Sequence, residues 1–301
     1  MFAAMPGEFA ALGTACCWAA SYILFTLAVR IAGPKWLNRW RLTVAAVLLL
    51  VVHGVAFGRP LPLDAGWGVW GWLTLSGVIG FAISDAFLFR ALYHIGAHRT
   101  SLVTSLIPVM STAMAWIVFG ETMSWTQLLA SAGVVAGIAL VVSARSPGRR
   151  DAANVRQATL GILFALGTVV TQSARYILSK KALAHAIPAL SANVVQIVAA
   201  AAAVWIAAFA GGRWKNDLEP FSDPRAAGGM IGGAIAGPFI GVTLSMVALS
   251  YARVGIASTL MALQPVLLLP FAALVLKERI GVRAIAGTAL AVGGVACLFL
   301  F

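Results

Sequence analysis

The chain has 301 residues, of which 61% are hydrophobic and 10% are charged. So few polar groups cannot cover a soluble globule of this size, which excludes an ordinary water-soluble domain and makes lipid the expected surroundings. The net charge of +12 would suit a nucleic-acid-binding protein, but the Lys and Arg residues lie between apolar stretches, so we expect them to set membrane orientation and expect no nucleic-acid partner.

Ten apolar stretches, separated by charged or Gly/Pro-rich breaks, predict an all-α membrane protein with ten transmembrane helices. Each stretch has about twenty residues or more, and at about 1.5 Å per residue such a helix crosses roughly 30 Å of hydrocarbon. A membrane barrel would need short strands of alternating hydrophobicity, which the sequence lacks. The predicted spans are 9–30, 36–57, 67–91, 99–119, 124–143, 158–181, 188–210, 227–251, 255–276 and 281–301.

The clearest internal repeat is residues 101–121, SLVTSLIPVMSTAMAWIVFGE, which align without a gap to residues 258–278, STLMALQPVLLLPFAALVLKE. Seven of the twenty-one positions are identical, and the spacing from proline to glutamate is the same in both copies. Weaker matches extend the duplication over the whole chain: Gly13-Thr14 with Gly167-Thr168, Tyr22-Ile23-Leu24 with Tyr176-Ile177-Leu178, Pro34 with Pro188, and Gly80 with Gly237. We therefore expect two five-helix repeats, 1–143 and 158–301, joined by a linker at 144–157.

An odd number of spans in each repeat makes the second copy enter the membrane from the opposite side. The two halves should then be inverted repeats related by an axis in the membrane plane. Sixteen of the twenty-one Lys and Arg residues fall in the odd-numbered connections or beside them. The positive-inside rule places those connections in the cytoplasm and both termini outside.

Several of these features together resemble the drug/metabolite transporter superfamily, and most closely its EamA-like exporters. They are two five-span halves, Trp18 in the first span, Pro34 before Arg41 in the second, and the Pro-x12-Glu pattern in spans four and nine. The resemblance implies a secondary transporter with a central cavity, most often an exporter of amino acids or related metabolites across the bacterial inner membrane. Many family members have basic residues in places that imply cytoplasmic termini, whereas this chain has them elsewhere. Small relatives that export cationic drugs have a glutamate within span one, and here the nearest acid is Glu8, at its mouth.

Inverted repeats place a substrate site near the bilayer midplane, where matching spans face each other. Residues near that depth include three repeat pairs, Trp18 with Gln172, Gly80 with Gly237, and Pro108 with Pro265. Each proline removes a backbone hydrogen bond, so its helix is expected to break or bend, as a hinge beside the cavity or as a structural kink. Thr104, Ser105 or cavity water could bond the freed carbonyl, and the Gln264 amide is a further candidate for the cavity wall.

The most polar stretch within any span runs from Thr171 to Tyr176 and contains Gln172 and Arg175. Arg175 stays charged, and its planar fork matches a carboxylate, so we expect it to bind substrate. Two alternatives are that it extends to the interface or pairs with Glu8.

Asp85 is the only acid deep in a span. It could bind a substrate amine, carry a coupling proton, or form a structural ion pair with Arg41. Counting along the spans puts Asp85 and Arg41 toward one membrane face and Arg175 toward the other, so we do not expect Asp85 and Arg175 to form one static clamp.

Aromatic and amide side chains complete the candidate set. Trp18, Tyr22 and Tyr176 could form aromatic walls of the cavity or simply pack. Asn193 and Gln196 could line the cavity or bond a neighbouring helix.

No metal site or cofactor is expected. His94 and His98 have the spacing of a metal pair, but no third ligand is near in sequence. The sequence has no nucleophile elbow, Walker lysine or HExxH helix, so we do not expect an enzyme.

The leading hypothesis is an exporter of amino acids or similar small metabolites that works by alternating access. The alternatives are a multidrug transporter, a transporter of sugars or phosphorylated metabolites, and, outside transport, an intramembrane enzyme or a scaffold. The expected partners are a small-molecule substrate and the lipid bilayer, and the chain is expected to be a monomer or a homodimer joined through the Gly-rich tenth span.

Overall fold

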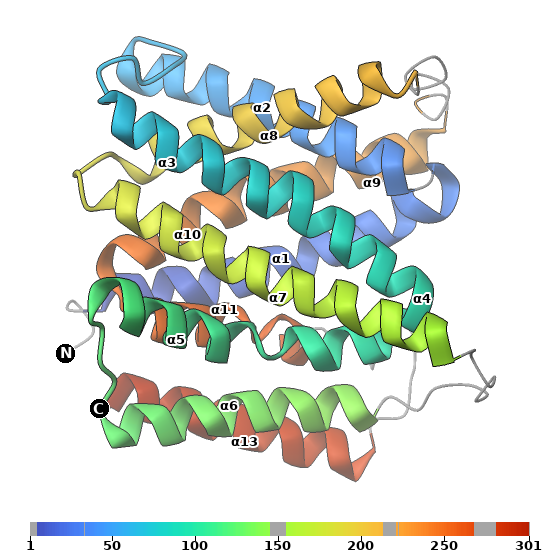
Figure 1. Cartoon of the computed structure of the whole chain (residues 1–301), viewed down its shortest axis with the longest axis vertical. Coiled ribbons are helices and arrows are strands. Elements are labelled where there is room, and N and C mark those ends of the chain that lie inside the picture. The colour runs from blue at the N-terminus through green and yellow to red at the C-terminus, as the bar shows by residue number, and fades with distance from the viewer. Residues whose placement is uncertain are drawn as a thin grey trace.

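The computed structural model describes residues 5–32, 34–144, 155–212, 221, 223–267 and 281–300. These residues form a bundle of helices, and no strand occurs among them (Figure 1). The elements of the first repeat are α1 (Pro6–Ala32), α2 (Pro34–Phe57), α3 (Trp67–Gly77), η2 (Val78–Ile83), α4 (Ser84–Thr104), α5 (Ile107–Phe119) and α6 (Trp125–Ala144). Those of the second are α7 (Val155–Leu183), α8 (Ala189–Ala210), α9 (Pro224–Ala234), η4 (Ile235–Gly241), α10 (Val242–Tyr251), α11 (Val254–Met261) and α13 (Val282–Leu300). The segments η2 and η4 are π-helical, and each continues the helices on both sides of it.

Residues with special backbone preferences mark several helix ends. Pro6, Pro34 and Pro224 each open a helix, where the missing amide proton costs nothing. Asp223 caps α9 by accepting bonds from the amides of Arg225 at 2.8 Å and Ala226 at 3.3 Å. Gly120 ends α5 in the left-handed conformation that favours glycine.

Apolar helices occur where the sequence predicts all ten spans, but they differ in length. Six described helical segments are long and apolar enough to cross a membrane: Pro6–Phe25, Trp36–Phe57, Trp67–Leu88, Gln157–Leu183, Ala189–Ala210 and Pro224–Tyr251. Four shorter apolar helices lie at the remaining predicted spans: Ile107–Phe119, Trp125–Val141, Val254–Leu267 and Val282–Leu298. A multi-pass membrane protein is thus established, and the full count of ten spans remains a prediction.

One predicted boundary is wrong. The apolar pattern predicts a connection between the third and fourth spans at 92–98, but α4 continues from Ser84 to Thr104. The second repeat does break at the corresponding place, between α10 and α11 at Ala252 and Arg253. The only glycine in the first-repeat segment is Gly96, and with no proline there the helical hydrogen bonds can continue.

The two repeats interleave. Helix α1 packs against α9, η4 and α10 of the second repeat, and α7 packs in the same way against α3, η2 and α4 of the first. Two further pairs join equivalent helices directly, α2 with α8 and α6 with α13, and α5 also packs against α11. Equivalent helices run in opposite directions, as the colours of α1 and α7 or of α2 and α8 show (Figure 1). The two repeats are therefore arranged as if related by an approximate two-fold axis.

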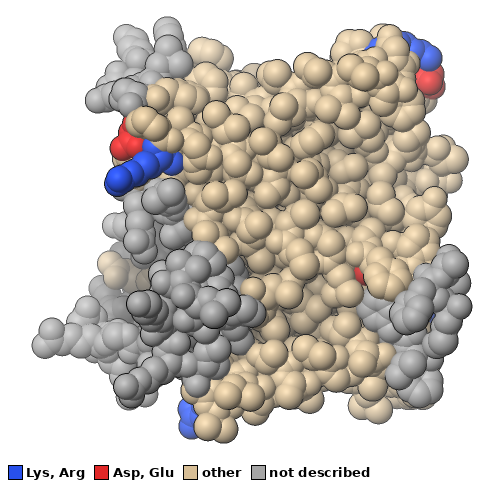
Figure 2. Space-filling view, turned by 180° about the vertical axis from the view of Figure 1, so that it is seen from behind, with Lys and Arg blue, Asp and Glu red and all other residues tan. Residues whose placement is uncertain are grey.

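The outer surface suits lipid. On the face in Figure 2, the charged side chains of the described residues lie near the margins of a broad uncharged area. The outermost pair, α6 and α13, packs through glycines, since a Cβ on Gly137 would lie 2.6 Å from the Gly287 carbonyl oxygen and 2.6 Å from the Ala291 amide nitrogen. Small residues let membrane helices approach this closely.

Candidate functional site

Both repeats interrupt their fourth-span helix at the same place. A turn at Ser105 and Leu106 separates α4 from α5, and a turn at Ala262 and Leu263 follows α11. Pro108 lies in the first turn of α5, where a proline costs no helical hydrogen bond. The carbonyl of Ile107, at the start of α5, accepts a bond from the Ser173 hydroxyl of α7 at 3.3 Å. The break therefore lies where a helix of the other repeat crosses.

The predicted residues around the two breaks differ in burial. Ser105 and Pro108 are buried, whereas Gln264 and Pro265, which follow the second turn, are half-buried.

A second repeated feature is the π-helical segment in each third span. Segments η2 and η4 occupy equivalent positions, and each contains a buried glycine, Gly80 or Gly237. A side chain on Gly80 would overlap the aliphatic carbons of Arg175. A Cβ on Gly237 would lie 2.6 Å from the Ser21 hydroxyl oxygen. Each glycine thus lets the first helix of the other repeat lie against the π-helical segment. Short π-helical segments within α-helices are frequent at functional sites.

Arg175 is wholly buried at its crossing, with 0% of its surface exposed. Its guanidinium lies 5.0 Å from the ring centre of Phe81 and 4.6 Å from that of Tyr176. With the Gln172 amide oriented so that its oxygen faces Arg175, that oxygen accepts from Nε at 3.2 Å and Nη2 at 3.1 Å. Nη1 has no hydrogen-bond partner among the described residues. The alternative that Arg175 extends to the membrane interface does not hold.

Asp85 forms an ion pair with Arg41. Arg41 is oriented by Asn38, whose side-chain oxygen accepts from its Nε at 2.9 Å and its Nη2 at 2.7 Å. The guanidinium also lies 5.6 Å from the ring centre of Phe25 on α1. Of the alternatives for Asp85, the ion pair with Arg41 is present in the structure.

The structure corrects the expected separation of Asp85 and Arg175. The residue count put them toward opposite faces, but in the structure they lie along the same part of the bundle, with no ion pair between them among the described residues. The reason is the crossing of α7 over η2, because Arg175 lies on Phe81 and Asp85 is one helical turn beyond Phe81. Arg41, Asp85 and Arg175 therefore form one group, called here the charged cluster, with two positive charges and one negative.

An exposed tyrosine of α1, Tyr22, lies one turn from the residue of α1 that contacts the charged cluster. Tyr22 is 46% exposed, although Ala15, two turns earlier on the same face of α1, is 0% exposed. Phe25, three residues after Tyr22 on that face, contacts Arg41. Tyr22 and the Phe25 that contacts Arg41 therefore share one face of α1.

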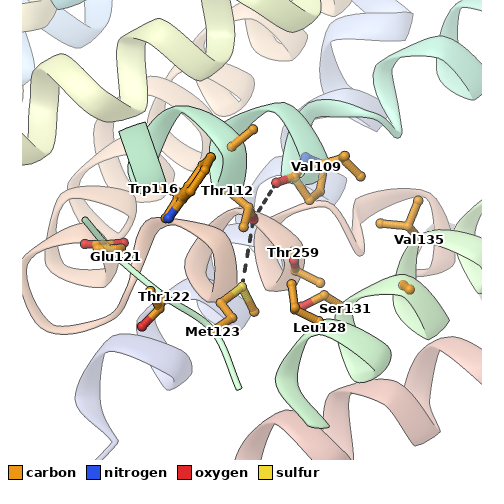
Figure 3. A pocket seen from close by; sticks show the side chains of 13 residues that line it. Val109, Thr112, Trp116, Glu121, Thr122, Met123, Leu128, Ser131, Val135 and Thr259 are labelled. Carbon is orange, nitrogen blue, oxygen red and sulfur yellow. Dashed lines mark hydrogen bonds between the residues drawn. The ribbon is translucent and has the colours of Figure 1, made fainter. Parts of the chain in front are cut away.

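Other predicted residues take different places. Trp18 packs against η4, where a Cβ on Gly241 would lie 2.8 Å from its Cδ1. Tyr176 is buried beneath the Arg175 guanidinium. A pocket of about 480 Å³ lies between α5 and α6, and of the predicted residues only Pro108 lines it (Figure 3).

Buried polar side chains hold the helices around the cluster. The Arg175 carbonyl accepts from the hydroxyls of Ser76 at 3.0 Å and Ser179 at 2.6 Å, and the Gln196 amide donates to both hydroxyls. Asn193 donates to the carbonyls of Pro238 at 3.0 Å and Phe239 at 3.2 Å in η4. Both amides therefore bond neighbouring helices, one of the two alternatives from sequence.

Glu121, the end of the Pro-x12-Glu motif, connects the repeats. Its carboxylate pairs with Lys180 of α7 at 2.6 Å and accepts from the Val254 amide of α11 at 2.9 Å. Lys180 also donates to the Ala252 carbonyl at 2.8 Å. The repeated Glu278 lies outside the described residues.

Three site residues were missed by sequence reasoning. Asn38 and Phe81 gave no signal, because an amide near a helix start and an aromatic in an apolar span are common. Arg41 was considered only as a structural partner, although a charge early in an apolar span was a usable sign. No group of three potential metal ligands gathers in the described part of the chain, and the side chain of His98 lies outside that part.

These features define a multi-pass membrane protein in which two repeats meet around a partly buried charged cluster. The EamA-like transporter family model matches residues 5–143 and 159–300, one match for each repeat. The chain belongs to this family of transporters.

Two relatives give further detail. A probable terminal-alkyne amino-acid exporter of Streptantibioticus cattleyicolor is 29% identical over 133 residues, which cover 44% of this chain and 43% of that protein. A solved crystal structure superposes with a TM-score of 0.78 at 20% identity, covering 100% of this chain and 97% of the other. At that identity the crystal structure supports the fold.

Proposed function

We propose that this protein is a secondary transporter that exports amino acids or similar small carboxylate-bearing metabolites by alternating access between its two inverted repeats. The observation that carries the proposal is the buried Arg175, whose Nη1 lacks a partner among the described residues where the repeats cross. A buried guanidinium nitrogen without a hydrogen-bond partner is costly, and a carboxylate oxygen would accept a bond from Nη1. The amino-acid exporter that shares 29% identity with part of the chain supports the same substrate class.

The charged cluster contains one suitable partner for each charged end of an amino acid. Arg175 would bind the carboxylate, and Asp85, which also faces Arg41, would accept the ammonium group. Tyr22, Trp18, Gln172, Tyr176 and Gln264 would shape the cavity, and the breaks near Ser105, Pro108 and Pro265 would let the fourth spans move. The protein would lie in the bacterial cytoplasmic membrane, with both termini outside by the positive-inside rule.

The test is counterflow of labelled amino acids in liposomes that contain the purified full chain. The parent should show saturable counterflow, and Arg175→Gln should lose most of it. Arg225→Gln, at an exposed arginine at the start of α9, is the control and should behave as the parent. Unchanged counterflow in Arg175→Gln would remove Arg175 from the site.

A second candidate is export of an anionic metabolite, such as an organic acid or a phosphorylated compound. The charged cluster has two arginines and one carboxylate, so it favours a net negative ligand. The same liposomes separate the two candidates, because Asp85→Asn should weaken counterflow of a zwitterion and strengthen that of a dicarboxylate. Flux of neither solute class in the parent would count against both candidates.

A further inference from the structure

The pocket between α5 and α6 is a groove whose lining includes none of the three residues of the charged cluster (Figure 3). Val109 and Trp116 on its α5 wall are 55% and 61% exposed, so the groove opens toward the lipid. Its floor includes Thr259 of α11, which is wholly buried. Most of the other lining side chains are apolar, and they include Ala113, Met123, Leu128, Ala132 and Val135.

The groove has a polar end and an apolar end. Glu121 and Thr122 line it where α5 connects to α6, while Val109 and Val135 line it further along the two helices (Figure 3). The eight residues from Val109 to Trp116 span about 10 Å along the α5 axis. The polar end thus lies at the helix ends and the apolar end lies deeper, which is the orientation of a membrane lipid.

An arginine lies beside the polar end. Arg253 is exposed, and its Nη1 donates to the Gln127 side-chain oxygen at 3.0 Å. Gln127 precedes Leu128 of the groove wall, and the residue after Arg253 bonds to Glu121. The Glu121 charge is offset by Lys180, whereas the ion pairs of the described residues give Arg253 no carboxylate. An exposed guanidinium at this position is suited to a phosphate group.

We propose that the α5–α6 groove binds a bilayer phospholipid, with an acyl chain along the two helices and the phosphate on Arg253. The surroundings are already lipid, and an apolar groove open to them would be filled by an acyl chain. The buried Ser131 hydroxyl, which has no partner among the described residues, would lie beside the carbonyl region of the lipid ester. The site is separate from the charged cluster and does not depend on what the protein transports.

Photolabelling tests the acyl-chain part of the proposal. The full chain is reconstituted in phosphatidylethanolamine and phosphatidylglycerol vesicles containing a phospholipid with a diazirine on its acyl chain, and labelled peptides are identified by mass spectrometry. We expect label to concentrate in residues 107–135 and to be lost from them in Ala132→Trp, which fills the groove. Ala136→Trp, at an exposed position one turn further along that does not line the groove, should keep it.

The headgroup part has its own variant, which keeps the groove intact. Arg253→Gln should reduce labelling by the phospholipid but not by a diacylglycerol with the same diazirine chain, and Arg225→Gln should change neither. Label spread evenly over exposed helices such as α7 would show bulk lipid contact only and overturn the proposal. Label that survives Ala132→Trp, or crosslinks between two copies of the chain at this groove, would also overturn it.

Discussion

The first helix of each repeat crosses a π-helical segment of the other repeat. The two crossings have the same backbone arrangement, but only one of them carries a charged side chain. At one, α7 crosses η2 and Arg175 lies on Gly80; at the other, α1 crosses η4 and Ser21 lies on Gly237. The alignment of Tyr22 with Tyr176 makes Ser21 and Arg175 equivalent. The same scaffold therefore carries a guanidinium in one copy and a hydroxyl in the other.

The other two residues of the charged cluster, Arg41 and Asp85, also have uncharged counterparts in the second repeat. The position equivalent to Arg41 is Val195, and the position equivalent to Asp85 is Val242, both of them buried. The two repeats thus share a symmetric frame, and each of the three charged residues has an uncharged residue at its equivalent position. Symmetry suits a mechanism in which two halves exchange positions, whereas binding a substrate with distinct ends needs an asymmetric site.

The largest difference between the crossings should come from removing the shared carboxylate. Asp85→Ala leaves Arg41 without its ion-pair partner and removes the carboxylate near Arg175, and we expect it to destabilise the protein by about 3–5 kcal/mol. Val242→Ala removes only apolar contacts and should cost roughly 1 kcal/mol. Unfolding of both variants in detergent measures the difference, and equal costs would mean that the cluster charges are already compensated by water.

Transport activity should depend on Arg175 but not on Ser21, its equivalent in the first repeat. Loss of the guanidinium in Arg175→Met removes one or two charge-assisted hydrogen bonds to substrate, about 1.5–3 kcal/mol each, which lowers affinity roughly 10- to 100-fold or more. Stability should change little, because methionine replaces a buried charge with an apolar chain of similar length. Ser21→Ala should transport as the parent does. Counterflow measured over a range of substrate concentrations decides, and equal loss in both variants would contradict an asymmetric site.

Alanine substitutions at Gly80 and Gly237 provide a further comparison of the two crossings. Gly80→Ala places a methyl group against the stem of Arg175 and should cost about 1–3 kcal/mol of stability, as overpacking does. It should also reduce transport, because the added methyl group displaces the Arg175 side chain from its position in the site. Gly237→Ala meets Ser21, so it should destabilise the protein without shifting a charged side chain. Unfolding and counterflow of the pair, compared with Gly68→Ala at a site with open space, show whether the effects separate as expected.

The smallest effect is expected at the connection between the repeats. Glu121→Gln removes the ion pair with the partly exposed Lys180 but leaves an oxygen for the Val254 amide, so we expect a loss of about 0.5–1 kcal/mol. Glu121→Ala removes both interactions and should cost more. A loss in Glu121→Gln as large as that in Glu121→Ala would show that the charge matters more than the helix-end bond.

Sequence alone determined the helical class, the lipid surroundings and the two repeats. Composition and apolar length decide the first two without any knowledge of packing, and the matching proline and glutamate of 101–121 and 258–278 reveal the third. It also singled out Gln172, Arg175 and Asp85, because polar groups are rare in apolar spans and are noticed for that reason. It misplaced the boundary at 92–98, since helix continuity there depends on packing rather than on a local breaker.

Only the tertiary structure decided which of these side chains meet. Arg175 and Asp85 are ninety residues apart in sequence and seemed to lie at different depths, and α7 crossing a π-helical segment brings them together. That crossing depends on Gly80, whose missing side chain makes room for the Arg175 stem. Helical periodicity reports the face of one helix, whereas the approach of two helices is set by side-chain volumes on both.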